Sequence, residues 1–270
     1  MKLFFALALL AAAFSACNDP VKPDTTDPGT TTSAIPAPAN IGFSIISEFP
    51  HDTSAYTQGL ELYNGKMYES TGDFTHSTLR ITDHKTGKVE QNHPMGTTEI
   101  FGEGITIFKG KLYQLTWESN IVYVYDVNNI NKPVKTFNWP YEGWGITNNG
   151  TDLIVSDGSS TIYFVSADSF KVTRSLEVQT DKGPVDNLNE LEYVNGFIYA
   201  NVYQTNIIVK IDPATGNIVG RLDFPETIKA AELAKNPRTA EFNGIAYDSA
   251  SKSFFLTGKR WSKMFEVKMN

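Results

Sequence analysis

The chain has 270 residues, of which 41% are hydrophobic and 12% aromatic, and this is enough to build one large domain with a substantial core. It carries 23 Lys and Arg against 30 Asp and Glu, a formal net charge of −7, and this acidic balance argues against nucleic-acid binding as the main function. The single cysteine, Cys17, excludes an intramolecular disulfide.

Residues 1–17 are typical of a targeting segment. Lys2 precedes an almost unbroken apolar run, residues 3–14, which is too short to span a membrane as a mature helix. The run leads into Ser15-Ala16-Cys17, and small residues before a lone cysteine resemble the processing site of bacterial lipoproteins. We therefore predict lipidation of Cys17, a membrane tether, and a place in the bacterial cell envelope facing the periplasm or the cell surface. The alternative is an ordinary signal peptide that contains a cysteine.

Residues 18–40 are predicted to form a disordered spacer. Five prolines lie here among Thr, Asp, Ala and Gly residues, so little of the stretch could pack into a core. Residues 41–49 then alternate between apolar and polar side chains, which predicts a strand, although no partner hairpin follows it.

From residue 56 onward, a similar segment recurs five times. The repeats open at Gln58, Glu103, Trp144, Asn189 and Asn243. These opening residues are 45, 41, 45 and 54 residues apart. A period of about 40–50 residues is typical of solenoids and propellers.

Each repeat contains short β-rich runs separated by turn signals such as Asn64-Gly65 and Asn195-Gly196. Four such runs per unit and five units predict an all-β fold, a five-bladed β-propeller over residues 41–270. The last repeat ends after three runs, so we expect residues 41–49 to supply its fourth strand and close the ring. The extra residues 226–241 predict a short amphipathic helix or lid between blades. A β-sandwich is the alternative fold, and the five-fold register argues against it.

Equivalent positions of the blades meet at the axis of a propeller. The opening residues therefore form a first ring, and positions about fourteen residues later form a second ring of Gly72, Trp117, Asp157, Tyr203 and Lys259. Such varied polar and aromatic residues are what a binding pocket requires. If both rings face the same mouth, Glu103 and Lys259 share a pocket walled by Trp117, Trp144 and Tyr203.

Each of these residues also has a structural interpretation. A lone Trp is more often a core residue, Glu103 could accept a hydrogen bond between blades, and Lys259 could pair with a structural carboxylate. Burial in a channel would raise the pKa of Glu103 and suit that residue to proton transfer. The four histidines, at positions 51, 76, 84 and 93, lack metal-ligand spacing, and we interpret them as surface or loop residues.

The chain resembles the plant-type glutaminyl-peptide cyclotransferases. The motifs occur in the family's order over about residues 41–270, and they include Tyr56-Thr57-Gln58-Gly59-Leu60, Phe101-Gly102-Glu103-Gly104, Gly143-Trp144-Gly145, Leu188-Asn189-Glu190-Leu191 and Thr257-Gly258-Lys259. The resemblance implies a five-bladed propeller enzyme that converts the N-terminal glutamine of peptides or proteins to pyroglutamate and releases ammonia. It also implies catalysis without a metal or another cofactor.

The resemblance further assigns roles to residues of the two rings. Glu103 would be the proton shuttle, and Gln58, Asn189 and Lys259 would hydrogen-bond the substrate, so that Glu103 and Lys259 are the predicted catalytic residues. Walls would come from Phe101, Trp117 and Trp144, and the Trp144 indole N–H is a candidate partner of the oxyanion. Tyr56 and Tyr203 stand where Phe and Trp are expected, and each keeps an aromatic wall but adds a hydroxyl.

Other functions stay open at this point. A non-catalytic propeller could bind peptides or proteins at the same channel mouth, and a propeller lactonase would need Asp, Asn and Glu ligands around a catalytic Ca²⁺. A structural Ca²⁺, as the family resemblance allows, has no recognisable loop motif in this sequence. We expect a monomer, because a closed propeller needs no partner to be stable.

Overall fold

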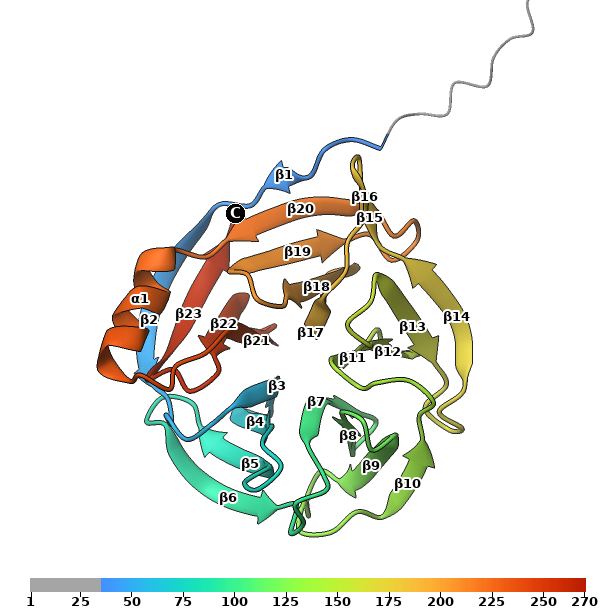
Figure 1. The fold of residues 1–270 in the computed structure, drawn as a ribbon, viewed down its shortest axis with the longest axis vertical. Coiled ribbons are helices and arrows are strands. Elements are labelled where there is room, and N and C mark those ends of the chain that lie inside the picture. The colour runs from blue at the N-terminus through green and yellow to red at the C-terminus, as the bar shows by residue number, and fades with distance from the viewer. Residues whose placement is uncertain (1–34) are drawn as a thin grey trace, which may run out of the picture. The chain divides into compact units, whose positions relative to one another are not determined.

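The computed structural model describes residues 35–270, in which five sheets surround a common centre (Figure 1). The first blade contains β3 (Thr57–Tyr63), β4 (Lys66–Thr71), β5 (Thr78–Asp83) and β6 (Lys88–Pro94). The second contains β7 (Gly102–Phe108), β8 (Lys111–Thr116), β9 (Ile121–Asp126) and β10 (Lys135–Asn138). The third contains β11 (Ile146–Asn148), β12 (Leu153–Ser156), β13 (Thr161–Val165) and β14 (Val172–Glu177).

The last two blades include strands from the start of the described chain. The fourth contains β17 (Leu188–Val194), β18 (Phe197–Val202), β19 (Ile207–Ile211), β20 (Ile218–Asp223) and the short β1 (Ala39–Asn40). The fifth contains β21 (Phe242–Asp248), β22 (Ser253–Gly258), β23 (Lys263–Met269) and β2 (Phe43–Pro50). A separate pair, β15 (Gln179–Thr180) and β16 (Gly183–Pro184), precedes the fourth blade. The predicted five-bladed propeller is confirmed.

The ring closes as the sequence predicts, because β2 pairs antiparallel with β23 and joins the two ends of the described chain in one sheet. This pairing gives the last blade its fourth strand and satisfies an edge that would otherwise be open. Ala39 and Asn40, which the sequence analysis assigned to the spacer, pair parallel with β20, and the Ile41 amide donates to the Arg221 carbonyl at 2.7 Å. The predicted signal peptide and Cys17 lie outside the described residues and stay predictions.

The turn chemistry of the repeats explains their regular hairpins. Asn64 and Gly65 both have positive φ, 50° and 75°, and this is the conformation that a two-residue turn of type I′ requires. The inner strand β3 is buried over its first four residues, and β7 is buried along its whole length. The turns therefore fix the pairing register of the hairpins, and this register places equivalent residues of the blades at the centre.

A buried carboxylate links three of the inner strands. Glu190 Oε1 accepts the Leu60 amide of β3 at 3.2 Å, and its Oε2 accepts the Ile245 amide of β21 at 2.8 Å. Burial raises the pKa of Glu190 well above its ordinary value. This side chain therefore serves as a hydrogen-bonding bridge between blades near the axis.

The inner strands also approach each other closely at glycines. A Cβ on Gly145 would lie 2.1 Å from the Asn189 carbonyl oxygen of the neighbouring blade. We expect Gly145→Ala to lower the free energy of unfolding by about 1–3 kcal/mol, because backbone would have to move apart at the ring's centre. Urea unfolding would measure this, with Gly42→Ala as the control, since a Cβ there meets nothing closer than 3.6 Å. Equal midpoints for the two variants would contradict the prediction.

The insertion at 226–241 forms the predicted helix, α1 (Glu226–Lys235). Its buried residue is Glu232, whose carboxylate accepts the Ser262 amide at 2.5 Å, while Leu233 is half exposed. Figure 1 shows α1 at the rim of the ring beside β2, so it does not cover the centre as a lid would. Within residues 35–270, no helix is both long and apolar enough to span a membrane.

Candidate active site

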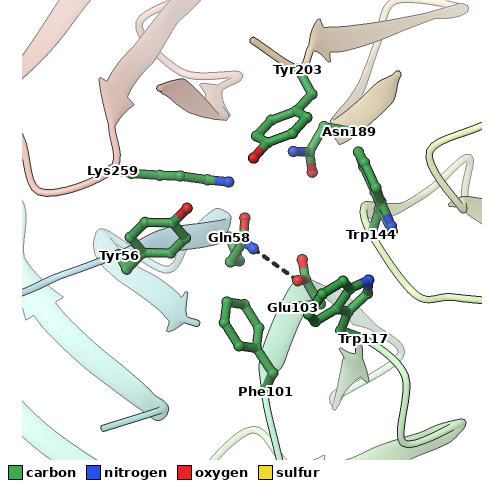
Figure 2. A pocket seen from close by; sticks show the side chains of 9 residues that line it. All are labelled: Tyr56, Gln58, Phe101, Glu103, Trp117, Trp144, Asn189, Tyr203 and Lys259. Atoms are coloured by element: carbon green, nitrogen blue, oxygen red, sulfur yellow. Dashed lines mark hydrogen bonds between the residues drawn. The ribbon is translucent and has the colours of Figure 1, made fainter. Parts of the chain in front are cut away.

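A cavity of about 240 Å³ opens where the inner strands meet, and Figure 2 shows the side chains that line it. All nine pocket residues expected from the sequence lie here: Tyr56, Gln58, Phe101, Glu103, Trp117, Trp144, Asn189, Tyr203 and Lys259. They come from all five blades, so the pocket exists only when the propeller is closed. The ring positions Gly72, Asp157 and Asn243 do not line it.

Glu103 and Gln58 form the polar centre of the cavity. Gln58 Nε2 donates to Glu103 Oε1 at 2.8 Å, and this bond is drawn in Figure 2. Asn243 Nδ2 donates to the Thr57 carbonyl at 3.0 Å and lies 3.5 Å from Gln58 Oε1. Asn243 therefore favours the orientation in which Nε2 of Gln58, and not Oε1, points to the Glu103 carboxylate. The sequence analysis did not assign this role to Asn243.

Glu103 is buried, with only 4% of the residue exposed. Burial raises its pKa well above the ordinary value, although the Lys259 ammonium and the hydrogen bond from Gln58 act in the opposite direction. The nearby carboxylate of Glu142 adds a further upward contribution to this pKa. A raised pKa makes this carboxylate a stronger base than an exposed glutamate, which suits it to proton transfer.

Lys259 projects its ammonium into the cavity between two aromatic rings. Its Nζ lies 4.7 Å from the ring centroids of both Tyr56 and Tyr203, a distance that suits cation–π contact. Burial lowers the pKa of Lys259, whereas Glu103 and Glu241 raise it. No ion pair joins this ammonium to a carboxylate within residues 35–270. The positive charge therefore remains available to a bound ligand.

The tryptophan walls are fixed by a residue that the sequence analysis missed. Glu142 Oε2 accepts the indole N–H of Trp117 at 2.8 Å and that of Trp144 at 2.9 Å. The Trp144 indole N–H, considered above as a partner for an oxyanion, is therefore already engaged. Trp144 instead offers its ring as a wall, packed edge to face against Tyr203 with centroids 5.4 Å apart.

His51 lies in the loop between β2 and β3, in agreement with its interpretation as a surface or loop residue, but its side chain is buried. The His51 side chain is 5% exposed, its Nε2 lies 2.9 Å from Glu69 Oε1, and its Nδ1 lies 2.9 Å from the Trp261 carbonyl. Burial would lower the pKa of His51, but the Glu69 carboxylate, the Trp261 carbonyl and Asp52 together outweigh it, so that pKa is raised. Glu69 also accepts the hydroxyl of Thr57, next to Gln58, so this pair supports the pocket from outside.

A metal site is not apparent in the described part of the chain. No group of three or more His, Cys, Asp or Glu side chains in residues 35–270 is arranged to hold a metal ion. The groups that the cavity does present are a buried carboxyl, two side-chain amides and an ammonium inside aromatic walls.

Comparisons with known proteins agree on one family. A family model described as glutamine cyclotransferase matches residues 10–269. The glutaminyl-peptide cyclotransferase of Arabidopsis thaliana is 39% identical over 228 residues, which cover 83% of this chain and 70% of the plant protein. The crystal structure of the glutaminyl cyclase of Myxococcus xanthus superposes with a TM-score of 0.78 at 34% identity, over 86% of this chain and 98% of that one.

Proposed function

This chain belongs to the glutamine cyclotransferase family, and we propose that it converts the N-terminal glutamine of peptides or proteins to pyroglutamate with release of ammonia. The observation that carries the proposal is the pairing of Glu103 with Gln58 in a pocket that also holds the Lys259 ammonium. The pocket is small and walled by aromatic rings, which suits one side chain and the amine beside it.

The proposed reaction is intramolecular. The α-amine nitrogen of the substrate attacks the carbon of its own side-chain amide, and a tetrahedral intermediate with a negatively charged oxygen forms. The C–N bond to the amide nitrogen then breaks, and that nitrogen leaves as ammonia. The step needs a neutral amine held in place, a positive partner for the oxygen, and a proton for the departing nitrogen.

Glu103 supplies the proton transfer in this mechanism. As a carboxylate it accepts the proton that the attacking nitrogen loses, and it returns the same proton to the leaving nitrogen. Burial raises the pKa of Glu103, which makes its carboxylate a stronger base for the first transfer than an exposed glutamate would be. Gln58 keeps the carboxyl oriented through the 2.8 Å hydrogen bond.

Lys259 and Asn189 supply the binding groups. The Lys259 ammonium, which no carboxylate of residues 35–270 neutralises through an ion pair, stabilises the negative oxygen of the intermediate. Asn189 Oδ1 is buried and has no hydrogen-bond partner among the described residues, so it is free to accept an N–H of the substrate. Trp117, Trp144 and Phe101 exclude water around these groups.

The test is ammonia release from a short peptide that begins with glutamine, followed by mass spectrometry of the product. We expect one ammonia per peptide, no release from the same peptide with an acetylated N-terminus, and unchanged turnover with EDTA, because attack needs a free amine and no metal. Binding of the peptide without any release would favour the alternative, a non-catalytic peptide-binding propeller. Loss of turnover with EDTA would contradict the metal-independent mechanism.

A further inference from the structure

We propose that Glu142 is a positioning residue, which holds both tryptophan walls of the pocket through a single carboxylate oxygen. The effect of Glu142 on catalysis rests on the proposed cyclisation, whereas its hydrogen bonds to the two indoles do not. Two indole N–H groups from two different blades converge on Glu142 Oε2, at 2.8 Å from Trp117 and 2.9 Å from Trp144. An indole is only a donor, so one shared acceptor fixes both rings together.

The backbone of Glu142 is itself anchored. The buried Trp139 donates its indole N–H to the Glu142 carbonyl at 3.0 Å, and the Asn120 side-chain amide donates to the carbonyls of Trp139 and Tyr141. The carboxylate therefore projects from a fixed turn between β10 and β11. This explains how an exposed glutamate can hold two half-buried rings in place.

The clamp extends beyond the two indoles. Trp117 packs against Phe101 with centroids 5.7 Å apart, and Trp144 packs against Tyr203 at 5.4 Å. Four of the aromatic walls therefore depend on this carboxylate, directly or through one neighbour. Figure 2 shows these rings on both sides of Glu103, so their placement sets the room in which the substrate amide must align.

Glu142 also acts on Glu103 through its charge. Burial is the main cause of the raised pKa of Glu103, and the Glu142 carboxylate raises that pKa further. The other titratable groups that face Glu103 are Lys259 of the fifth blade, Tyr56 before β3 and Tyr203 after β18. Removing the charge of Glu142 alone lowers the pKa of Glu103, so the acid limb of the pH profile moves to lower pH.

Two substitutions separate the clamp from the charge. Glu142→Gln keeps an oxygen that accepts both indoles, so KM should stay within about twofold while the acid limb of kcat/KM shifts to lower pH. Glu142→Ala loses both hydrogen bonds, and we expect kcat/KM to fall about tenfold or more, mainly through KM. Glu118→Gln, which removes an exposed charge next to Trp117, should leave both parameters unchanged.

A measurement without substrate tests the clamp itself. The chain has four tryptophans, and their indole N–H groups can be followed by ¹⁵N NMR. In Glu142→Ala the signals of Trp117 and Trp144 should shift and exchange faster with solvent. That of Trp261 should not move, because it donates to the backbone carbonyl of Ala240 at 3.1 Å and makes no hydrogen bond to residue 142.

The outcomes distinguish the two proposals. Unmoved Trp117 and Trp144 signals would overturn the clamp, whatever the activity. Moved signals with unchanged kcat/KM in Glu142→Ala would overturn its positioning role. Moved signals in a protein whose wild type releases no ammonia would retain the clamp and reject the cyclisation.

Discussion

Glu103→Gln should reduce the turnover number for cyclisation by about 10²–10⁴-fold, the range expected when a general acid–base group is lost. The substituted amide has the same shape, and its oxygen can still accept the hydrogen bond that Gln58 donates at 2.8 Å. It cannot take a proton from the attacking amine or return one to the leaving nitrogen. The pocket and its walls are retained, so peptide affinity should change little.

This prediction separates the enzyme from a peptide-binding module. Ammonia release gives the turnover number, and calorimetry with a slowly converted peptide gives the affinity. Glu103→Asp is the matched variant, because it keeps a carboxylate one methylene further from the substrate and should recover part of the activity. If Glu103→Gln kept the turnover number of the wild type, another group would have to transfer the proton.

The repeat register explains why the pocket was predictable. In a propeller, equivalent residues of successive blades converge at the axis, so the period alone predicts that Gln58, Glu103, Trp144 and Asn189 lie close together, although the fifth member of this ring, Asn243, does not line the pocket. The same count places Glu142 two residues before Trp144, as Tyr56 precedes Gln58 and Phe101 precedes Glu103. The signal for Glu142 was therefore present, but not the direction of its side chain.

What the register could not supply are contacts specific to one blade. The pairing of His51 with Glu69 joins a residue before the first repeat to one within it, and no period relates them. The same holds for the parallel pairing of Ala39 and Asn40 with β20. Likewise, α1 contacts the fifth blade through the Glu232 carboxylate, which accepts the Ser262 amide, a contact between an insertion and a turn. Periodic features were predictable, and unique side-chain contacts were not.

Lys259→Met should lower kcat/KM by about 10²–10³-fold, as expected when a group that stabilises a developing oxyanion is removed. Methionine keeps an apolar stem between Tyr56 and Tyr203 but has no charge. In the wild type the ammonium lowers the pKa of Glu103 against the upward effect of burial. Without the ammonium, this downward contribution is lost, and the pKa of Glu103 rises further.

The direction of the pH shift follows from that sign. Glu103 must be ionised to accept the amine proton, so the acid limb of the kcat/KM profile should move to higher pH in Lys259→Met, opposite to its shift in Glu142→Gln. In the wild type, activity should also fall at high pH, where Lys259 loses its proton. Burial lowers the pKa of Lys259 below its ordinary value of 10.5, so this basic limb should lie below pH 10.5. Lys268→Met, which removes an exposed charge from β23, should shift neither limb. An acid limb that stays in place in Lys259→Met would mean that the two charges are not coupled, and the ammonium would then act only as a binding group.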